Sequence, residues 1–462
     1  MRKEAFMPDI SKAKNPAETL IEVLRTEDPL QINAFLGDLK PGDEARALAQ
    51  LDKVQQQRLL EILGPEKSAE LLVKITGRGV VSVIEQMPLK QAADIFDEMP
   101  SRQQVDILRR LKEKDAAQII GAFAAPRAEK LRELIAYPED TAGGLMIPEY
   151  LAFSRGMTVR DVLDDLREHG EVYSDYAIQY AYVVSEAGRL LGVLRLRDLL
   201  LAPKSKPLMD IMIKDPQKVR VDTTLKDLKE FFKQVNYLGV PVVDSEDRLL
   251  GVVLAAVVRE AVNKRSNQIF LQFSGIVGGE EFRTMPLFKR SSRRLSWLSI
   301  NIVLNIVAAS VIALYQDTLE KAIVLAVFLP IISDMSGCSG NQAVAVSIRE
   351  LSLGLVRPKE LLRVLSKESS IGIINGVVLG LLLGGVAFLW KGNPYLGLVV
   401  GVSLAANTLL AVSFGGMIPL ILRRVGADPA LASGPLLTTI TDMCGFFFVL
   451  SFASALLTKL SV

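Results

Sequence analysis

The sequence has few of the residues that build disulfide-bonded, zinc-binding or catalytic proteins. Its 462 residues include two cysteines and one histidine. Cys338 and Cys444 both lie in apolar segments and His169 stands alone, so the spacing supports neither a disulfide framework nor a cysteine-rich zinc site. No nucleophile paired with a base, zinc motif or phosphate-binding loop is recognisable. We therefore expect no enzyme and no catalytic residues, and a reducing cytosol fits the soluble part.

An excess of charge of one sign is also lacking. Lys and Arg number 54 and Asp and Glu 52, which leaves a net charge of +2. No block of basic residues interleaved with aromatics is found, which argues against nucleic acid as a partner. The opening MRKEAFMPDISKAKNP has no apolar core and so does not predict a cleavable secretory signal. We expect the first membrane helix to direct targeting.

Long apolar runs are abundant, but only in the C-terminal part. Apolar residues make up 50% of the chain. Up to about Arg294 they alternate with charged residues at helical and strand periods, whereas from Leu295 onward apolar runs follow one another. A bilayer core of about 30 Å requires about 20 helical residues. Five segments are long enough: 295–315, 322–348, 371–390, 396–422 and 433–457.

The short connectors between these segments predict the orientation. Lys and Arg accumulate on the cytoplasmic side of membrane proteins. They are concentrated before the first span and in the connectors 349–370 and 423–432, whereas YQDTLEK and KGNPY hold few cations. We therefore expect a multi-pass protein of the cytoplasmic (inner) membrane, with a cytosolic N-terminus and the C-terminus outside.

The few polar side chains inside the spans are the candidate ion ligands. A carboxylate at bilayer depth costs about 3 kcal/mol even on lenient scales, so it usually faces a cavity, an ion or a partner. None of the five segments contains a Lys or Arg that would neutralise Asp334 or Asp442. Oxygen-only ligands suit a hard cation such as Mg²⁺. The candidate metal ligands are Asp442, Asp334, Asn341 and Thr439; Asn407, in the fourth span, is a further polar exception.

The second span contains LPIISDMSGCSGNQA, in which a proline and small residues are expected to weaken or open the helix. Gly337 and Gly340 are three residues apart. This spacing fits close helix packing as well as a pore lining.

The soluble part is expected to contain two kinds of module. Residues 16–137 are predicted to form stacked short helices in a solenoid-like arrangement, because leucine-rich stretches alternate with breaks and the phrase Met-Pro recurs at Met87-Pro88 and Met99-Pro100. Between 147 and 262 a strand–strand–helix pattern appears twice, as AYVVSEAGRLLGVLRLRDLLLAP and GVPVVDSEDRLLGVVLAAVVREAV. These two units resemble a pair of CBS domains, which often bind nucleotides or ions in their clefts.

Two motifs extend the resemblance to one family. YPEDTAGGLM (137–146) resembles the segment joining the helical domain to the CBS pair in MgtE magnesium channels, and DPALASGPLLTTITDMCG (428–445) matches the same family. The resemblance covers essentially the whole chain. It implies a homodimer whose second and fifth spans line one pore, Asp442 as the pore aspartate that holds hydrated Mg²⁺, and 270–290 as an amphipathic helix that closes the pore.

The expected architecture is therefore multidomain. An α-helical solenoid-like N domain (1–140), a tandem α/β CBS pair (141–265) and an amphipathic linker helix (266–294) precede an all-α membrane domain of five transmembrane helices per subunit (295–462). Carboxylates that are candidates for a regulatory metal site in the soluble part are Asp94, Asp97, Glu98, Asp227, Glu230 and Asp247.

The sequence departs from the family at three places. The second span has DMSGCSGNQ where the family has a sequence close to GMGGNAGTQ, so Asp334 is an added carboxylate. The family's acidic run after the second CBS unit is replaced by LAAVVREAVNKRSN, which keeps only Glu260. In the nucleotide cleft, Arg195 and Val257 replace the usual hydroxyl residue and aspartate, although Asp198 is kept, so nucleotide binding stays open.

Three functions are compatible with these observations. The first is a magnesium-conducting dimeric channel gated by its cytosolic domains. The second is a carrier that exchanges a divalent metal for protons or sodium, with Asp334 as the extra ionisable group. The third is a membrane-anchored CBS sensor that conducts nothing, in which the buried carboxylates would have no evident purpose.

Overall fold

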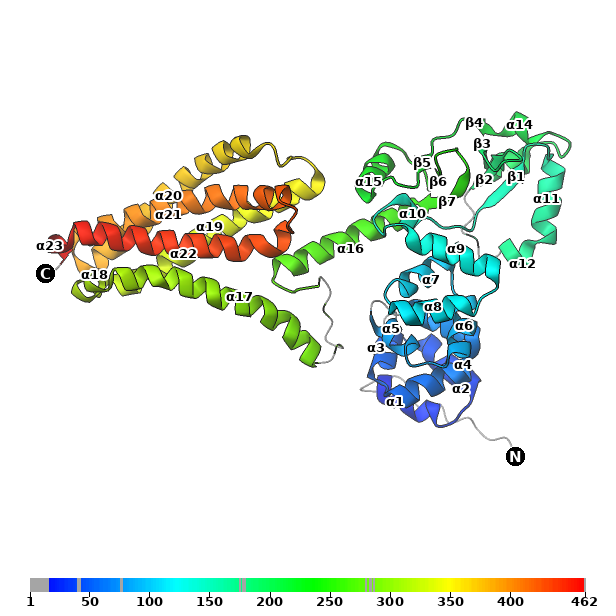
Figure 1. Cartoon of the computed structure of the whole chain (residues 1–462), viewed down its shortest axis with the longest axis horizontal. Coiled ribbons are helices and arrows are strands. Elements are labelled where there is room, and N and C mark those ends of the chain that lie inside the picture. The colour runs from blue at the N-terminus through cyan, green and yellow to red at the C-terminus, as the bar shows by residue number, and fades with distance from the viewer. Residues whose placement is uncertain are drawn as a thin grey trace. The chain divides into compact units, whose positions relative to one another are not determined.

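The chain forms two units, Met1–Lys264 and Arg265–Val462, in the computed structural model (Figure 1). The structure describes residues 16–39, 43–74, 78–173, 176, 180–278, 281, 285 and 287–460. The first unit holds the soluble modules. The second holds the long apolar helices.

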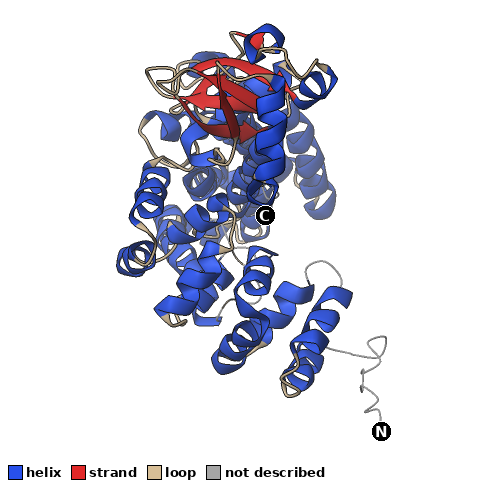
Figure 2. Cartoon of the chain, turned by 90° about the vertical axis from the view of Figure 1, so that its right-hand side faces the viewer, coloured by secondary structure: helices blue, strands red, loops and turns tan. Residues whose placement is uncertain are grey.

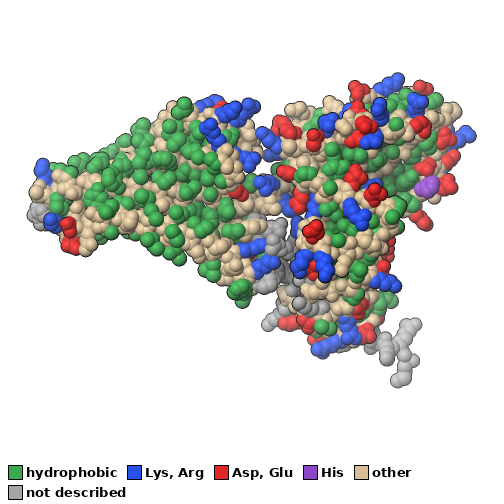
Figure 3. All heavy atoms as spheres, viewed as in Figure 1, with side chains coloured by type: hydrophobic (Ala, Val, Ile, Leu, Met, Phe, Trp, Pro, Cys, Tyr) green, Lys and Arg blue, Asp and Glu red, His purple; other side chains and the backbone are tan. Residues whose placement is uncertain are grey.

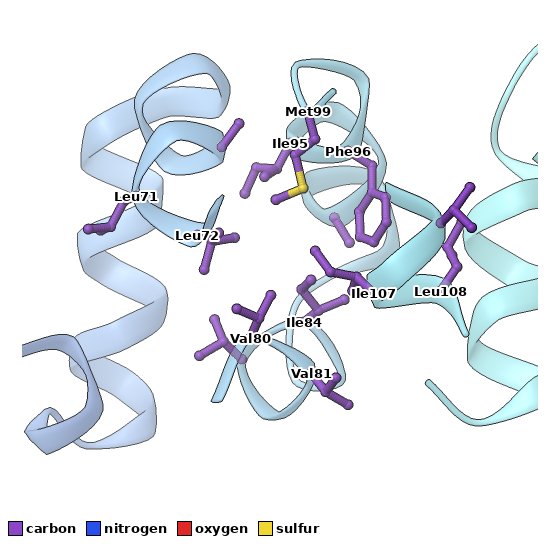
Figure 4. Packing of buried hydrophobic residues seen from close by; sticks show 14 of the residues in the cluster. Leu71, Leu72, Val80, Val81, Ile84, Ile95, Phe96, Met99, Ile107 and Leu108 are labelled. Carbon is purple, nitrogen blue, oxygen red and sulfur yellow. The ribbon is translucent and has the colours of Figure 1, made fainter. Parts of the chain in front are cut away.

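The first module of the soluble unit is helical, as the sequence predicts. Its helices are α1 (Pro16–Leu24), α2 (Pro29–Asp38), α3 (Asp43–Gln50), α4 (Lys53–Lys74), α5 (Arg78–Ile84), α6 (Leu89–Asp97), α7 (Ser101–Leu108), α8 (Glu113–Gly121) and α9 (Ala125–Ala136). Their apolar faces form a continuous core, part of which is drawn in Figure 4. Neighbouring helices each contribute a few side chains to it, which is how short helices stabilise one another in a solenoid.

The recurring Met-Pro phrase starts two of these helices. Pro88 and Pro100 have extended backbones and directly precede α6 and α7. Proline suits this position because it has a fixed φ and its missing N–H is not needed by the first helical turn. The buried Gln104 Nε2 donates to the carbonyls of Phe96 and Met99, at 2.6 Å each, and so ties α7 to the end of α6.

Two small sheets follow (Figure 2), and they confirm the repeated strand–strand–helix pattern. The first sheet has the order β1 (Leu151–Ser154), β2 (Tyr180–Val184), β3 (Leu190–Arg195), β4 (Ile213–Lys214), and the second has β5 (Val219–Arg220), β6 (Gly239–Val243), β7 (Leu249–Leu254). In both, the first pair of strands is parallel and the next is an antiparallel hairpin. The hairpins continue into α13 (Leu196–Leu201) and α16 (Ala255–Phe273).

The helices around the sheets are short. They are α10 (Ala142–Leu145), α11 (Val159–Glu168), α12 (Gly170–Tyr173), α14 (Leu208–Ile211) and α15 (Leu225–Gln234). The two hairpin turns lie side by side, since Leu190 donates its N–H to the Asp247 carbonyl and Leu249 donates to that of Gly188. Each repeat thereby helps to order the turn of the other.

The segment between the sheets and the membrane helices differs from the single amphipathic helix expected over 266–294. The described part of it is helical only at its two ends: α16 ends at Phe273, and the next helix begins at Leu287. Gly275 and Gly278 follow α16 with φ of 79° and 95°, a left-handed backbone that glycine adopts without strain. Two positive-φ residues so close together stop a right-handed helix.

After the end of α16, the described residues of the second unit form five long helices and two short ones. They are α17 (Leu287–Leu314), α18 (Gln316–Lys321), α19 (Leu325–Leu353), α20 (Leu361–Lys391), α21 (Pro394–Arg424), α22 (Pro429–Ala455) and α23 (Leu457–Leu460). In the described residues, α17, α20, α21 and α22 are long and apolar enough to span a membrane. With 29 residues α19 is of similar length, but its middle part contains polar side chains, among them Asp334, Asn341 and Gln342. Figure 3 shows that charged side chains are nearly absent from the visible surface between the two ends of this unit.

The backbone of α19 corrects one expectation. Pro330 and the glycines were expected to weaken or open this span, but the helix is continuous from Leu325 to Leu353. Gly340 instead allows close packing, because a Cβ added there would lie 2.8 Å from the Ala411 carbonyl oxygen of α21, whereas one added to Gly337 would meet only Thr441 Oγ1 at 3.9 Å. Gly340 therefore serves helix contact within this subunit.

Candidate functional site

Asp442 lies on α22, where α19 and α21 both pack against that helix. Its carboxylate is half-buried, and the Ser333 hydroxyl of α19 donates a hydrogen bond to Oδ1. In the described residues, no other hydrogen bond and no ion pair involves this carboxylate. One oxygen of Asp442 is thus oriented by a neighbouring helix, and the negative charge is not neutralised by a basic side chain.

The helical turn that carries Asp442 is also held from α21. Asn407 is fully buried, and its Nδ2 donates to the Thr441 carbonyl oxygen at 3.0 Å. The Thr441 hydroxyl donates to the Thr438 carbonyl at 2.9 Å, so it is bonded within its own helix. Asp442 is therefore contacted by α19 through its side chain, and its turn is contacted by α21 through the backbone.

In the described residues, none of the other three predicted metal ligands forms a hydrogen bond or ion pair with Asp442. Asp334 is exposed on α19, and Asn341 is half-buried two turns further along the same helix. Thr439 Oγ1 donates to the Pro435 carbonyl at 2.8 Å. Within the described ranges, no three His, Cys, Asp or Glu side chains converge as a metal-binding group would require. Asp442 is the candidate that the fold surrounds with neighbouring helices.

The chemistry available around Asp442 comes from oxygen atoms alone. A carboxylate and the Ser333 hydroxyl lie together, and such ligands suit hard cations that retain water. A partly hydrated ion needs a few oriented acceptors rather than a complete protein cage. The arrangement fits an ion that passes the site, and the ion is then the substrate.

Four of the six carboxylates predicted for regulation already have partners. Asp97 forms an ion pair with Arg127, Glu230 with Lys233 at 3.1 Å, and Asp247 with Lys218 at 2.8 Å. Asp227 accepts a hydrogen bond from the Thr224 hydroxyl at 2.8 Å at the start of α15. Asp94 and Glu98 are exposed on and just after α6. These side chains are dispersed over the unit, and three of the six are paired with nearby cations.

A charged contact joins the helical module to α16. Arg102 of α7 forms an ion pair with Glu260 of α16 at 3.1 Å. Burial raises the pKa of Asp106, one turn further along α7, while the nearby charges of Arg102 and Lys264 partly offset this rise. Acidic and basic side chains of α7 and α16 thus alternate across the contact.

Among the residues of the expected nucleotide cleft, Asp198 has basic partners. Asp198 lies 3.6 Å from Arg195 and 3.5 Å from Arg197, and Val257 of α16 is buried. The kept acidic residue is therefore paired with neighbouring arginines.

Sequence reasoning missed two residues at the site. Ser333 is one of many serines in membrane helices, and no local pattern distinguishes it. Gly445 lies one turn after Thr441, and a Cβ there would be 2.7 Å from Asn407 Nδ2. The polarity of Asn407 was visible in the sequence, but its partner depends on helix packing that the sequence does not specify.

Family models match three parts of the chain: the MgtE model "Divalent cation transporter" at 329–452, the "MgtE intracellular N domain" at 39–140 and the CBS domain at 142–205 and 208–263. The chain is 32% identical to the magnesium transporter MgtE of Thermus thermophilus, covering 98% of this chain and 99% of the relative. It is 27% identical to that of Bacillus subtilis, covering 96% and 97%. A crystal structure of the cytosolic domain of the Mg²⁺ channel MgtE in complex with ATP aligns at 30% identity with a TM-score of 0.48, covering 53% of this chain and 99% of that one.

Proposed function

Because the chain belongs to the MgtE family of divalent cation transporters, we propose that it moves Mg²⁺ across the cytoplasmic membrane and that Asp442 binds the passing ion. The observation that carries the assignment is the position of Asp442 on a membrane helix, half-buried, oriented by Ser333 and without a basic partner in the described residues. A carboxylate in that setting gains most by facing a cation.

The proposal includes a homodimer. Asp442 and Ser333 are the ligands one subunit offers, too few for a dehydrated ion but enough for one that keeps part of its water shell. A second copy would double the set, and Asp334, exposed on α19, would lie near the same path. Asn341 and Thr439 are proposed as further oxygen ligands of the hydrated ion. The Thr439 hydroxyl donates its hydrogen to the Pro435 carbonyl, so its oxygen lone pairs can still accept from a water of the ion.

The cytosolic modules are proposed to regulate this transport. We assign residues 1–140 to a helical domain, 141–265 to the CBS pair, 266–294 to the linker that joins them to the pore, and 295–462 to the membrane domain. The cation-rich connectors at 349–370 and 423–432 support a cytosolic N-terminus and an outer C-terminus.

Uptake of Mg²⁺ into proteoliposomes tests the proposal. We expect Asp442→Asn to reduce uptake at least about tenfold, since a neutral amide of equal size keeps the packing but removes the charge that attracts the ion. Gel filtration in detergent should show the same folded oligomer for the variant. Unchanged uptake by a folded Asp442→Asn variant would remove Asp442 from the path, and a requirement for a proton or sodium gradient would favour the carrier over the channel.

A further inference from the structure

The hydrogen bond between Asn407 and the Thr441 carbonyl lies directly beside the proposed ion ligand. The Thr441 carbonyl and the Asp442 N–H belong to one planar peptide group. Holding the carbonyl oxygen therefore fixes the plane from which the Asp442 side chain starts. Asn407 Nδ2 holds it at 3.0 Å from a fully buried position on α21.

The amide orientation follows from simple chemistry. A carbonyl oxygen only accepts hydrogen bonds, so the nitrogen of the Asn407 amide must face it. In a regular helix the same carbonyl also accepts from the N–H of residue 445, and one oxygen with two lone pairs accommodates both donors. Asn407 Oδ1 is buried and has no hydrogen-bond partner among the described residues. The hydrogen bond from Nδ2 is therefore made although the other end of the amide carries an unfavourable unpaired acceptor.

Gly445 provides the room for this contact. A Cβ at residue 445 would lie 2.7 Å from Asn407 Nδ2, closer than a methyl group and an amide nitrogen can approach. The backbone of residue 445 is ordinary helix, so a methyl group there is excluded by the neighbouring amide and not by its φ. Asn407 and Gly445 are thus two halves of one contact between α21 and α22.

We propose that Asn407 is a positioning residue for Asp442. It acts through the backbone of α22 and does not touch the ion: it fixes the rotation and depth of the turn on which the carboxylate stands, while Ser333 orients the carboxylate itself. Selection among hydrated divalent ions of similar size depends on where the acceptors lie, so loss of this contact changes the apparent affinity and the metal preference. This role rests on the proposed function of Asp442.

The test is a double-mutant cycle in proteoliposomes, with Asn407→Ala, Gly445→Ala and the double variant. We expect each single change to raise the KM for Mg²⁺ about threefold to tenfold, the range of one membrane hydrogen bond, and to weaken discrimination against Co²⁺ and Ni²⁺. The added methyl group displaces the amide, so Gly445→Ala should reproduce Asn407→Ala without removing a polar group. The double variant should be no worse than either single one, because both remove the same contact.

Asn301→Ala is the matched control. Asn301 also lies in a membrane helix, but its Nδ2 donates to Trp297 within α17 at 3.2 Å, so its loss should leave KM and metal preference unchanged. A purely structural role of Asn407 would lower the melting temperature with a normal KM and normal metal competition, and this result would overturn the proposal. If Asn407→Ala does not fold, Gly445→Ala decides by the same readouts.

Wild type and Asp442→Asn are measured alongside. Normal KM in the Asn407 and Gly445 variants, with Asp442→Asn inactive, would overturn the positioning role alone. Equal transport by wild type and Asp442→Asn would instead remove the proposed function, and the positioning role with it.

Discussion

At the scale of single residues, the two membrane carboxylates have different surroundings. Asp442 is half-buried and accepts a hydrogen bond from Ser333, whereas Asp334, the next residue along α19, is exposed in the subunit. In the described residues Asp334 has neither a hydrogen bond nor an ion pair. A carboxylate without partners at membrane depth is stable only if it faces water, an ion or another subunit. We therefore propose that Asp334 lies beside the ion path and not at its centre.

Replacing Asp334 should give a partial effect. We expect Asp334→Asn to lower Mg²⁺ uptake by less than Asp442→Asn does and to shift the metal preference, because a peripheral charge attracts cations without holding them in one geometry. Uptake at low and high ionic strength measures this, since attraction by a solvated charge weakens with salt. Normal transport with unaltered metal preference would make Asp334 a structural residue.

At the scale of elements, α20 and α21 are joined by glycines. Cβ atoms added to Gly376, Gly380 and Gly384 would lie 2.5 to 2.7 Å from carbonyl oxygens of α21. The two backbones therefore lie in direct contact along several turns. Lipid tails are as apolar as the helix side chains, so the hydrophobic effect does not drive two membrane helices together. Close packing of this kind supplies much of the attraction between them.

Gly380→Ala should separate these helices slightly and destabilise the membrane unit. Its methyl group would lie 2.5 Å from the Gly401 carbonyl oxygen, which is backbone and cannot move aside alone. We expect a loss of about 1–3 kcal/mol, typical of overpacking, seen as a lower melting temperature in detergent. Gly385→Ala is the control on the same helix, because nothing lies within 4 Å of its added Cβ. Equal melting temperatures for both variants would contradict the role of the glycine contacts.

The elements show which sequence signals are decisive. The recurring Met-Pro motif predicted the starts of α6 and α7, and the repeated hairpin sequence predicted the two β-hairpins. Both signals depend only on residues close together in the chain. The expected opening of α19 was wrong, since small residues that weaken an isolated helix are satisfied here by packing against α21. The positive φ of Gly275 and Gly278 was likewise not predicted, because an amphipathic pattern does not show where a helix stops.

The candidate site was predictable only in part. Asp442 stood out as a carboxylate in an apolar span, and Asn407 as an isolated amide. That both meet at one turn of α22, with Ser333 on the other side, depends on the register of three helices. The register is set by contacts between residues far apart in the chain, for which the sequence has no local signal.

At the scale of the whole molecule, the soluble unit pairs many of its carboxylates with basic side chains. Carboxylates are paired with cations between α7 and α16 and at several places in the helical and CBS modules. Each exposed pair contributes only about 0–1 kcal/mol. The summed contribution of these pairs to stability is therefore modest. A carboxylate that already faces Arg or Lys nevertheless gains less free energy from binding Mg²⁺ than one that faces another carboxylate.

Removal of Mg²⁺ should therefore change the arrangement of the soluble unit little. Repulsion between carboxylates is the force that a bridging metal relieves, and in the described residues the contact of α7 with α16 places Arg102 opposite Glu260 and Lys264 near Asp106. We expect limited proteolysis of the full-length protein to give similar patterns in chelator and in millimolar MgCl₂, when KCl keeps the ionic strength equal. Raising the KCl concentration should increase cleavage near α16, because salt screens exposed ion pairs.

Charge-neutral variants distinguish an ion-pair contact from a metal site. Glu260→Gln should increase cleavage near α16 to the same extent with and without Mg²⁺, since it breaks the pair with Arg102 at 3.1 Å whether or not metal is present. Lys233→Gln is the control, because its partner Glu230 lies on the same helix and their pair joins no modules. Strong protection between 254 and 290 that is specific for Mg²⁺ would contradict the prediction, and its loss in Glu260→Gln would identify that carboxylate as a metal ligand. Gating that persists at very low Mg²⁺ would instead agree with the ion pairs, because these hold α16 against the helical module at any metal concentration.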